Sequence, residues 1–255
     1  MPAELGFTTY GHGPLRVLVL HDWFCDHSSW DPTLPYLTPD RFTYVFGDLR
    51  GYGTSREIEG TNTLDEAADD AIAIADKLGW TRFSLVGHSM SGLIVQRIAQ
   101  LAPERIARIV AITPASPAGM GLPQAAVDHF RAIAFADDDQ RFAALSEMWG
   151  ARLSKTWIRF KLTRWRETAS PAAAAKYVEL WGCSDISQNA RGLETPMLII
   201  TAAHDAPPFQ AAALEVSMLP YYPNAKLISL GESGHYPMQE QPPLLATLVE
   251  RFLSE

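Results

Sequence analysis

The chain has 255 residues, of which 47% are hydrophobic and 20% are charged, a composition typical of a globular protein with a large core. Its 29 acidic and 21 basic side chains give a net charge of −8, which argues against binding to nucleic acid or to an anionic membrane, because both repel an acidic protein. No apolar stretch approaches the roughly 20 residues that cross a bilayer, and residues 1–6 lack the basic and apolar run of a secretion signal. We therefore expect a cytoplasmic protein whose partner is a small molecule, and the sequence does not indicate an oligomeric state.

Two cysteines, Cys25 and Cys183, are too few for a disulfide scaffold and do not have the spacing of metal ligands. We interpret both as buried or pocket-lining thiols. The sequence implies no metal and no organic cofactor.

The first half of the chain alternates between predicted strands and helices. Residues 15–20 and 42–46 are apolar and β-prone, and Thr63 and Glu66 have the spacing of a capping box before a helix that Gly79 ends. Next come an apolar run that leads to Gly87, a helix that ends near Leu101 before Pro103, and a strand over residues 106–112. This order is typical of a parallel sheet with crossover helices.

The second half begins with a change in character. Residues 114–193 contain no convincing strand, and prolines and glycines are followed by helical stretches rich in alanine and tryptophan. Strands return at 196–201 and 225–230, and a helix over 243–253 closes the chain. We therefore predict one α/β domain, with a core formed by residues 1–113 and 194–255 and a helical cap formed by residues 114–193.

The predicted cap is rich in large aromatic and sulfur-containing side chains. They are Phe130, Phe135, Phe142, Met148, Trp149, Trp157, Phe160, Trp165 and Trp181. Most of them are expected to pack the cap, and a minority to line an apolar substrate pocket, for which Trp149, Trp157 and Trp181 are our candidates. The basic residues among them are interpreted as a solvated helix face; they are Arg159, Lys161, Arg164 and Arg166.

A turn of small residues follows the strand that ends near residue 88. The sequence Gly87-His88-Ser89-Met90-Ser91 places small residues two before and two after a serine, which lets strand and helix approach closely enough for a sharp corner. Such a corner exposes the serine hydroxyl. Ser89 is therefore the candidate nucleophile, although Ser91 stands where the G-x-S-x-G pattern has its second glycine.

A serine hydroxyl needs a base within hydrogen-bond reach, and that base needs a carboxylate partner. Of seven histidines, His235 alone follows a strand in a glycine-flanked loop directly before the last helix, so it is our candidate base. His88 is interpreted as structural, and His12 and His129 as surface or packing residues. The remaining histidines lie on loops at strand ends and stay open as alternatives; they are His21, His27 and His204.

The candidate acid is Asp205, because it directly follows the preceding strand and therefore reaches the same edge of the sheet. Asp48 and Asp185 are weaker alternatives: Asp48 opens a glycine-rich loop that we interpret as a structural turn braced by Arg50. The chain order is then Ser89, Asp205, His235, which is the order of a nucleophile, acid and base in α/β-hydrolases.

Four motifs in this order resemble those of the α/β-hydrolase superfamily over nearly the whole chain. They are His21-Asp22-Trp23-Phe24, Asp48-x-Arg50-Gly51-x-Gly53-x-Ser55, Gly87-His88-Ser89-Met90-Ser91-Gly92 and Gly234-His235-Tyr236-Pro237. The resemblance implies an α/β fold with a mostly parallel eight-stranded sheet and a helical cap. It also implies an oxyanion hole formed by the backbone N–H groups of Trp23 and Met90, with Phe24 and His21 near the substrate. In this chain Asp22 replaces the glycine that the family has after the histidine.

The leading hypothesis is hydrolysis of an ester, lactone or activated carbon–carbon bond of a small, largely apolar or aromatic substrate through an acyl-enzyme. Two alternatives remain. The stretch Trp23-Phe24-Cys25-Asp26-His27 is similar to a loop of cofactor-independent dioxygenases of this superfamily, which act on hydroxy-oxoquinolines with a histidine–aspartate pair as base. The turn Gly87-His88-Ser89-Met90-Ser91 also resembles that of small-molecule receptors of this superfamily, which retain the serine, the acid and the histidine.

Overall fold

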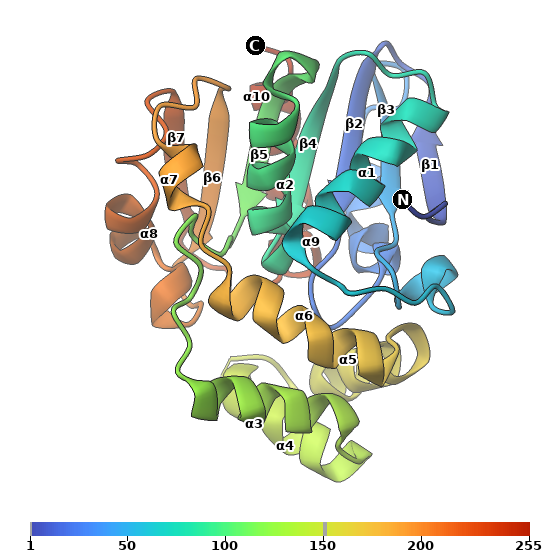
Figure 1. The fold of residues 1–255 in the computed structure, drawn as a ribbon, viewed down its shortest axis with the longest axis vertical. Coiled ribbons are helices and arrows are strands. Elements are labelled where there is room, and N and C mark those ends of the chain that lie inside the picture. The colour runs from blue at the N-terminus through green and yellow to red at the C-terminus, as the bar shows by residue number, and fades with distance from the viewer. Residues whose placement is uncertain (1, 150–151) are drawn as a thin grey trace.

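A seven-stranded sheet forms the middle of the molecule in the computed structural model, which describes residues 2–149 and 152–255 (Figure 1). The strands are β1 (Phe7–Gly11), β2 (Leu15–Leu20), β3 (Phe42–Gly47), β4 (Phe83–His88), β5 (Ile106–Ile112), β6 (Met197–Ala202) and β7 (Ala225–Leu230). Their spatial order is β1-β3-β2-β4-β5-β6-β7, and all neighbours are parallel except β1 and β3. The predicted α/β class is confirmed.

The strand count differs from the expectation of eight, since the described residues contain seven. The sequence also gave no prediction for β1. This edge strand is half exposed, with Thr8 and Thr9 facing solvent, so it lacks the apolar run by which the central strands are found.

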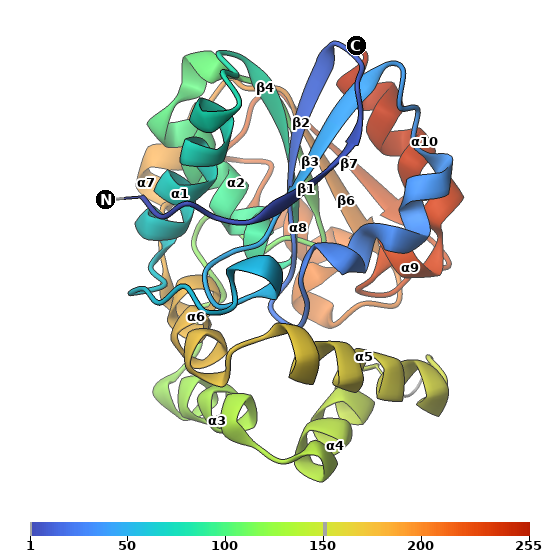
Figure 2. The same ribbon diagram turned by 90° about the vertical axis from the view of Figure 1, so that its right-hand side faces the viewer.

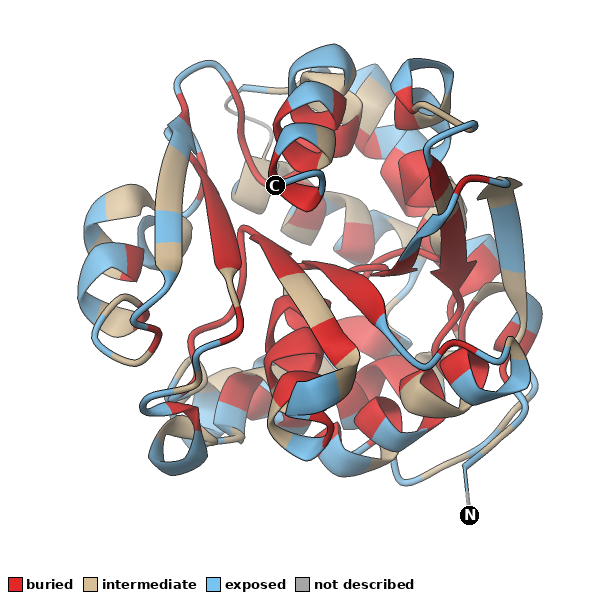
Figure 3. Cartoon of the chain, turned by 90° about the horizontal axis from the view of Figure 1, so that it is seen from above, coloured by how far each residue is buried: buried red, intermediate tan, exposed pale blue. Residues whose placement is uncertain are grey.

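Helices cover both faces of the sheet, as Figure 2 shows with the sheet nearly edge-on. On one face lie α1 (Leu64–Lys77) and α2 (Met90–Leu101), and on the other lies α10 (Pro242–Leu253). Two clusters of buried apolar side chains fill the spaces between these layers. The central strands are therefore buried from both sides, which Figure 3 shows from above.

The N-terminus of α1 is capped largely as its sequence predicts. The Thr63 side chain accepts a hydrogen bond from the Glu66 backbone N–H at 3.3 Å. Glu66 does not complete a capping box with Thr63: its carboxylate accepts from the Asn62 N–H at 2.7 Å and pairs with Arg50 at 3.2 Å. At the other end, Gly79 adopts a φ of +66°, in the left-handed region that favours glycine.

Four helices form the cap, beyond the carboxyl ends of the parallel strands (Figures 1 and 2). They are α3 (Gln124–Phe135), α4 (Asp138–Trp149), α5 (Lys155–Thr168) and α6 (Pro171–Cys183). The rest of the helices are short: α7 (Ser187–Ala190), α8 (Ala211–Ser217) and α9 (Pro237–Glu240), with 3₁₀ turns at His27–Tyr36, Gly53–Ser55, Pro103–Arg105 and Pro207–Phe209. Among the described residues, none of the helices combines the length and the apolar character needed to span a bilayer.

The strand order determines where a site can form. From β2 the chain moves outward to β3, whereas from β4 it moves outward to β5, so the loops that follow these two neighbouring strands diverge. Such a point at the carboxyl edge of a parallel sheet is where α/β proteins bind ligands. The loop after β2 contains Trp23, and the turn after β4 contains Ser89.

The two cysteines differ in their surroundings. Cys25 is buried, as predicted, whereas Cys183 is exposed at the end of α6, where it lines a surface pocket away from Ser89.

Candidate active site

Ser89 lies in a strained turn between β4 and α2. Its φ of +55° and ψ of −115° are rare for a residue with a side chain, and such strain is typical of functional turns. A Cβ atom at Gly87 would lie 2.3 Å from the carbonyl oxygen of Ser91, so the close approach of strand and helix requires glycine there. Ser91 fits at the second small position and donates a hydrogen bond from Oγ to the carbonyl oxygen of His21.

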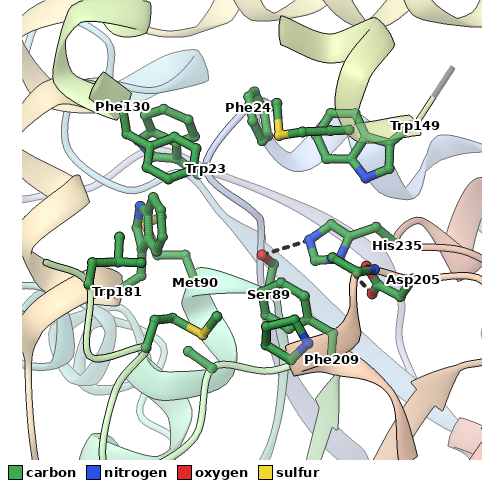
Figure 4. Close-up of a pocket in the computed structure, with 16 residues that line it drawn as sticks. Trp23, Phe24, Ser89, Met90, Phe130, Trp149, Trp181, Asp205, Phe209 and His235 are labelled. Atoms are coloured by element: carbon green, nitrogen blue, oxygen red, sulfur yellow. Dashed lines mark hydrogen bonds and ion pairs between the residues drawn. The ribbon is translucent and has the colours of Figure 1, made fainter. Parts of the chain in front are cut away.

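Ser89, His235 and Asp205 form one chain of hydrogen bonds (Figure 4). His235 Nδ1 lies 2.7 Å from Asp205 Oδ2, and His235 Nε2 lies 2.8 Å from Ser89 Oγ. Because an ionised carboxylate only accepts, Nδ1 carries the proton, and the lone pair of Nε2 faces the serine hydroxyl. The imidazole therefore has the tautomer that a general base needs.

The topology explains why these residues meet. Asp205 follows β6 and His235 follows β7, and β6 and β7 are parallel neighbours, so both loops leave the same edge of the sheet. The Asp205 carboxylate is fixed in turn by the Ala206 backbone N–H, which donates to Oδ1 at 2.6 Å. All three side chains lie at the carboxyl edge that the sequence predicts.

Two opposing effects act on the pKa of His235. Burial lowers it, because a buried imidazolium loses its hydration, but the adjacent Asp205 carboxylate raises it through its charge and its hydrogen bond. The net result is a pKa above the ordinary value of 6.5. His235 is thus a stronger base than a free imidazole.

His88 is hydrogen-bonded to the backbone of the loop that contains His235. Its Nε2 lies 2.7 Å from the carbonyl oxygen of His235, and since a carbonyl only accepts, Nε2–H is the donor. Burial lowers the pKa of His88 to about 3, so its ring is neutral. This placement agrees with the structural interpretation of His88.

Trp23 and Met90, the candidate oxyanion-hole residues, both line the cavity beside Ser89. Met90 is the first residue of α2, where backbone N–H groups have no partner within the helix. Trp23 is held on two sides: its carbonyl accepts from the Tyr52 hydroxyl at 2.8 Å, and its indole N–H donates to the Ala174 carbonyl at 2.7 Å.

A cavity of about 260 Å³ opens next to Ser89, between the core and the cap. Its walls are almost entirely apolar. They consist of Trp23, Phe24, Ser89, Met90, Ala115, Met120, Leu122, Phe130, Met148, Trp149, Trp181, Asp205, Ala206, Pro208, Phe209 and His235. Among the candidate substrate-binding residues, Phe24, Trp149 and Trp181 are brought to this cavity.

Two other candidates, His21 and Trp157, are not among the residues that line it. His21 is fully buried behind the loop, where Nε2 accepts from the Leu49 N–H at 3.1 Å and Nδ1 donates to the Asp22 carbonyl at 2.7 Å. Trp157 packs against Trp149 and Tyr236 instead. Helix periodicity alone does not show which aromatic residues of the cap face inward.

Phe209 is a cavity residue that sequence reasoning missed. Its ring centroid lies 4.9 Å from that of His235, and on the opposite side the Trp149 ring lies nearly parallel to the imidazole at 6.0 Å. Its place in the sequence could have indicated this role, because Phe209 lies four residues after Asp205 in the same loop. The two aromatic rings limit the directions in which His235 can rotate.

The alternative acids and bases lie elsewhere. Asp48 accepts hydrogen bonds from His27 and Thr54, and Arg50 donates to the Glu59 carbonyl oxygen at 3.1 Å, so both side chains hold the loop as predicted. Asp185 and His204 are exposed. His27, Asp48, Asp185 and His204 therefore all lie outside the hydrogen-bond chain of Ser89, His235 and Asp205.

One group of potential metal ligands is present among the described residues. Asp26, His27 and Asp48 each offer an atom within 4.8 Å of the others. These atoms already bind one another and the loop: His27 Nδ1 lies 2.9 Å from Asp48, and Asp26 accepts from the Ser28 N–H at 3.1 Å. We interpret the group as the hydrogen-bonded base of the loop after β2.

The basic residues of α5 form the predicted solvated face only in part: Arg159 and Arg166 are exposed, whereas the other two are not. Lys161 is completely buried, and Arg164 is partly buried and lies 3.4 Å from Asp26. The prediction is wrong for Lys161 and Arg164, because it treated α5 as an isolated helix, whereas these two side chains lie against residues of the loop after β2.

The comparisons with known proteins agree with this architecture. The sequence profile of the alpha/beta hydrolase family matches residues 17–248. A pimeloyl-[acyl-carrier protein] methyl ester esterase from Legionella pneumophila is 25% identical over 252 residues, which cover 96% of this chain and 97% of that protein.

Two solved structures are similar along almost their whole length. A hydrolase from Oleispira antarctica has a TM-score of 0.86 at 23% identity, covering 99% of this chain and 95% of that one. The enol-lactonase from Burkholderia xenovorans LB400 has a TM-score of 0.85 at 22% identity, covering 98% and 96%. At this level of identity the likeness of these structures demonstrates a common fold.

Proposed function

The chain belongs to the alpha/beta hydrolase family, and from this membership and the surroundings of Ser89 we propose that it is a serine hydrolase of small carboxylic esters or lactones. The observation that carries the proposal is the hydrogen-bond chain Ser89–His235–Asp205, with distances of 2.8 and 2.7 Å. The esterase name of the Legionella relative and the lactonase name of the Burkholderia structure support the same reaction class.

The reaction follows from the proton positions. Ser89 Oγ attacks the carbonyl carbon of the substrate while His235 Nε2 takes the hydroxyl proton, and Asp205 stabilises the imidazolium. The negative charge on the carbonyl oxygen is stabilised by the backbone N–H groups of Trp23 and Met90. When the tetrahedral intermediate collapses, the alcohol leaves with the proton from His235, and an acyl group remains on Ser89.

Water completes the cycle. His235, neutral again, takes a proton from a water molecule, which attacks the acyl carbon and forms a second tetrahedral intermediate. That intermediate collapses to the free acid and returns the proton to Ser89. An activated carbon–carbon bond would be cleaved by the same groups if the leaving carbon were protonated in place of the alcohol oxygen.

The cavity favours a neutral, compact substrate. Its volume of about 260 Å³ lies just below the usual range of small-molecule sites, which is about 300–1,000 Å³. None of the residues that line it in the described parts of the chain is lysine or arginine. A carboxylate on the acyl chain would therefore lose its hydration without gaining a charged partner.

The loop that resembles those of the ring-cleaving dioxygenases does not favour the oxygenase alternative. Cys25, Asp26 and His27 do not line the cavity, and His27 is paired with Asp48. Ser89 Oγ lies 2.8 Å from His235 Nε2, and an acyl-enzyme mechanism requires this contact between nucleophile and base. No observation on the cap favours a receptor over an enzyme.

We predict that Ser89→Ala lowers ester hydrolysis by about 10⁴-fold or more, because the nucleophile is lost while the fold is kept. The assay uses p-nitrophenyl acetate, butyrate and benzoate, with intact-mass measurement after treatment with a serine-reactive phosphonate. Wild-type protein gains one phosphonyl group and Ser89→Ala gains none, with unchanged circular dichroism.

The exposed Ser254→Ala serves as the matched control and is expected to behave like wild type. Near wild-type turnover in Ser89→Ala would contradict the acyl-enzyme mechanism. Oxygen consumption with a hydroxy-oxoquinoline, independent of Ser89, would support the oxygenase instead. A p-nitrophenyl ester of glutarate, which carries a free carboxylate, tests the cavity: we expect about 10²-fold lower kcat/KM than for the butyrate.

A further inference from the structure

A lysine of the cap lies buried behind the loop that follows β2. Lys161, in the middle of α5, is 0% exposed, although lysine is rarely buried without a charged partner. Its Nζ lies 3.9 Å from Asp22 Oδ2 and 3.8 Å from the centre of the Tyr236 ring. Within residues 2–149 and 152–255, Nζ has no hydrogen-bond partner, so its surroundings compensate its charge through Asp22 and the ring face.

Asp22 is the partner of this lysine and the residue that replaces the glycine of the family motif. It is fully buried, and its Oδ2 accepts a hydrogen bond from the Tyr236 hydroxyl at 2.6 Å. Burial would raise the pKa of Asp22, but the charge of Lys161 and the hydrogen bond from Tyr236 contribute to lowering it to about 2. Asp22 is therefore an anion at neutral pH.

The carboxylate of Asp22 joins three parts of the molecule. Lys161 belongs to the cap, Asp22 directly precedes Trp23, and Tyr236 directly follows His235. The groups that the reaction needs on two different loops, the N–H of Trp23 and the ring of His235, are thus one residue away from the same buried ion pair.

A second link from the cap reaches the same loop. The Trp23 indole N–H donates to the carbonyl oxygen of Ala174 on α6 at 2.7 Å. The loop is therefore attached to α5 through a charge and to α6 through a hydrogen bond. Lys161 itself does not line the cavity, so it acts on the substrate only through its neighbours, of which Asp22 and Tyr236 are the nearest.

We propose that Lys161 is a positioning residue, which through Asp22 and Tyr236 fixes the Trp23 N–H and the His235 loop in the geometry that the transition state requires. This inference rests on the proposed hydrolase function. Because an oxyanion hole acts in the transition state, the loss of Lys161 lowers kcat and leaves KM nearly unchanged.

The test compares Lys161→Met, Asp22→Asn and the double variant with wild type, using p-nitrophenyl butyrate and the phosphonate. Lys161→Met leaves a buried carboxylate without its counter-charge, so we expect a lower melting temperature and a kcat reduced by about 10- to 100-fold. The double variant removes both charges, and we expect its melting temperature to recover while its kcat stays low, with KM within about twofold of wild type.

The comparison of kcat with melting temperature distinguishes a positioning role of Lys161 from a purely structural one. If kcat recovers together with the melting temperature in the double variant, the pair is only structural and the inference is wrong. If Lys161→Met fails to fold, the double variant alone decides, by the same criterion. Lys155→Met, an exposed lysine at the start of the same helix, is the matched control and is expected to keep wild-type kcat.

The two hypotheses fail in different ways. If wild-type protein neither hydrolyses the esters nor reacts with the phosphonate, the proposed function is wrong and the inference falls with it. If wild type does both, and the double variant matches it in kcat and in the rate of phosphonate labelling, the positioning role alone is overturned.

Discussion

The environment of the His235 imidazole determines how the enzyme responds to pH. A base must be neutral to accept the Ser89 proton, and the net effect of burial and Asp205 is a pKa above 6.5. The value of kcat/KM should therefore fall as the pH decreases through that pKa, with a midpoint above pH 6.5. A profile of p-nitrophenyl butyrate hydrolysis between pH 5 and 9 measures it.

Asp205→Asn supplies the control for this prediction. Without the carboxylate, burial dominates and the pKa of His235 decreases, so the acidic limb moves to lower pH. The rate also falls by about 10³- to 10⁴-fold, because the amide no longer stabilises the imidazolium or its tautomer. An acidic limb that stays in place would mean that a group other than Asp205 sets the pKa.

At the level of single residues, the sequence was informative where chain order limits the choices. Asp205 and His235 follow neighbouring strands, so their meeting is a consequence of topology that the strand pattern already contains. Lys161 could not be placed in this way. Its burial depends on which side of α5 lies against the loop after β2, and that contact joins segments about 140 residues apart.

Among the elements, the turn between β4 and α2 leaves no room for a side chain at position 87. We predict that Gly87→Ala destabilises the protein by about 2–4 kcal/mol, because the new Cβ would lie 2.3 Å from the Ser91 carbonyl oxygen and would force strand and helix apart. Thermal unfolding should show a melting temperature lower by about 5–15 °C.

Gly231→Ala is the control for that substitution, since a Cβ there meets nothing within 4 Å. We expect it to unfold at the wild-type temperature. An equally stable Gly87→Ala would show that the turn can relax, and that the small residue is not required for the corner.

Most of the predicted elements are strands buried on both faces or helices capped by local sequence; β7 is an exception, since only Leu230 of this edge strand is buried. Strands β2 to β7 have apolar runs, and α1 has Thr63 before it and Gly79 after it. The edge strand β1 and the short helix α8 have neither signal. Their structure depends on β3 and on β6 and β7, to which they are attached only in the folded chain.

For the molecule as a whole, the pair of His27 and Asp48 links stability to pH. Burial would raise the pKa of Asp48, but the hydrogen bond from His27 contributes to lowering it to about 2, below the ordinary 3.8. The stability that this carboxylate contributes is complete well above pH 3.8 and is lost as the pH falls toward 2. His27 behaves in the opposite sense: its hydrogen bond to Asp48 raises its pKa, so its contribution is complete below pH 6.5 and declines as the pH rises above that value.

We expect the free energy of unfolding to fall by about 2 kcal/mol between pH 5 and pH 2 on account of Asp48. In Asp48→Asn this part of the decrease disappears, although the variant is less stable at pH 6. Urea denaturation at several pH values measures both effects. The exposed Asp69→Asn should retain the wild-type slope, and an unchanged slope in Asp48→Asn would contradict the assignment.

The α/β architecture could be predicted because it depends on the distribution of strands along the chain. The shape of the cavity could not. The cavity forms where Phe130, Trp149 and Trp181 of the cap meet Trp23 and Phe24 of the core. The sequence of each part has no periodic pattern that shows how the two are oriented relative to each other.

The attachment of the loop after β2 to the cap limits how such a protein can be recombined. A chimaera that exchanged residues 114–193 for another cap would leave Asp22 without Lys161 and the Trp23 indole without the Ala174 carbonyl. Asp22 and Lys161 therefore depend on each other, although more than 130 positions separate them, whereas the bond from Trp23 requires only a backbone carbonyl at position 174. A library that exchanges caps should keep Asp22 and Lys161 together and preserve the backbone path of α6.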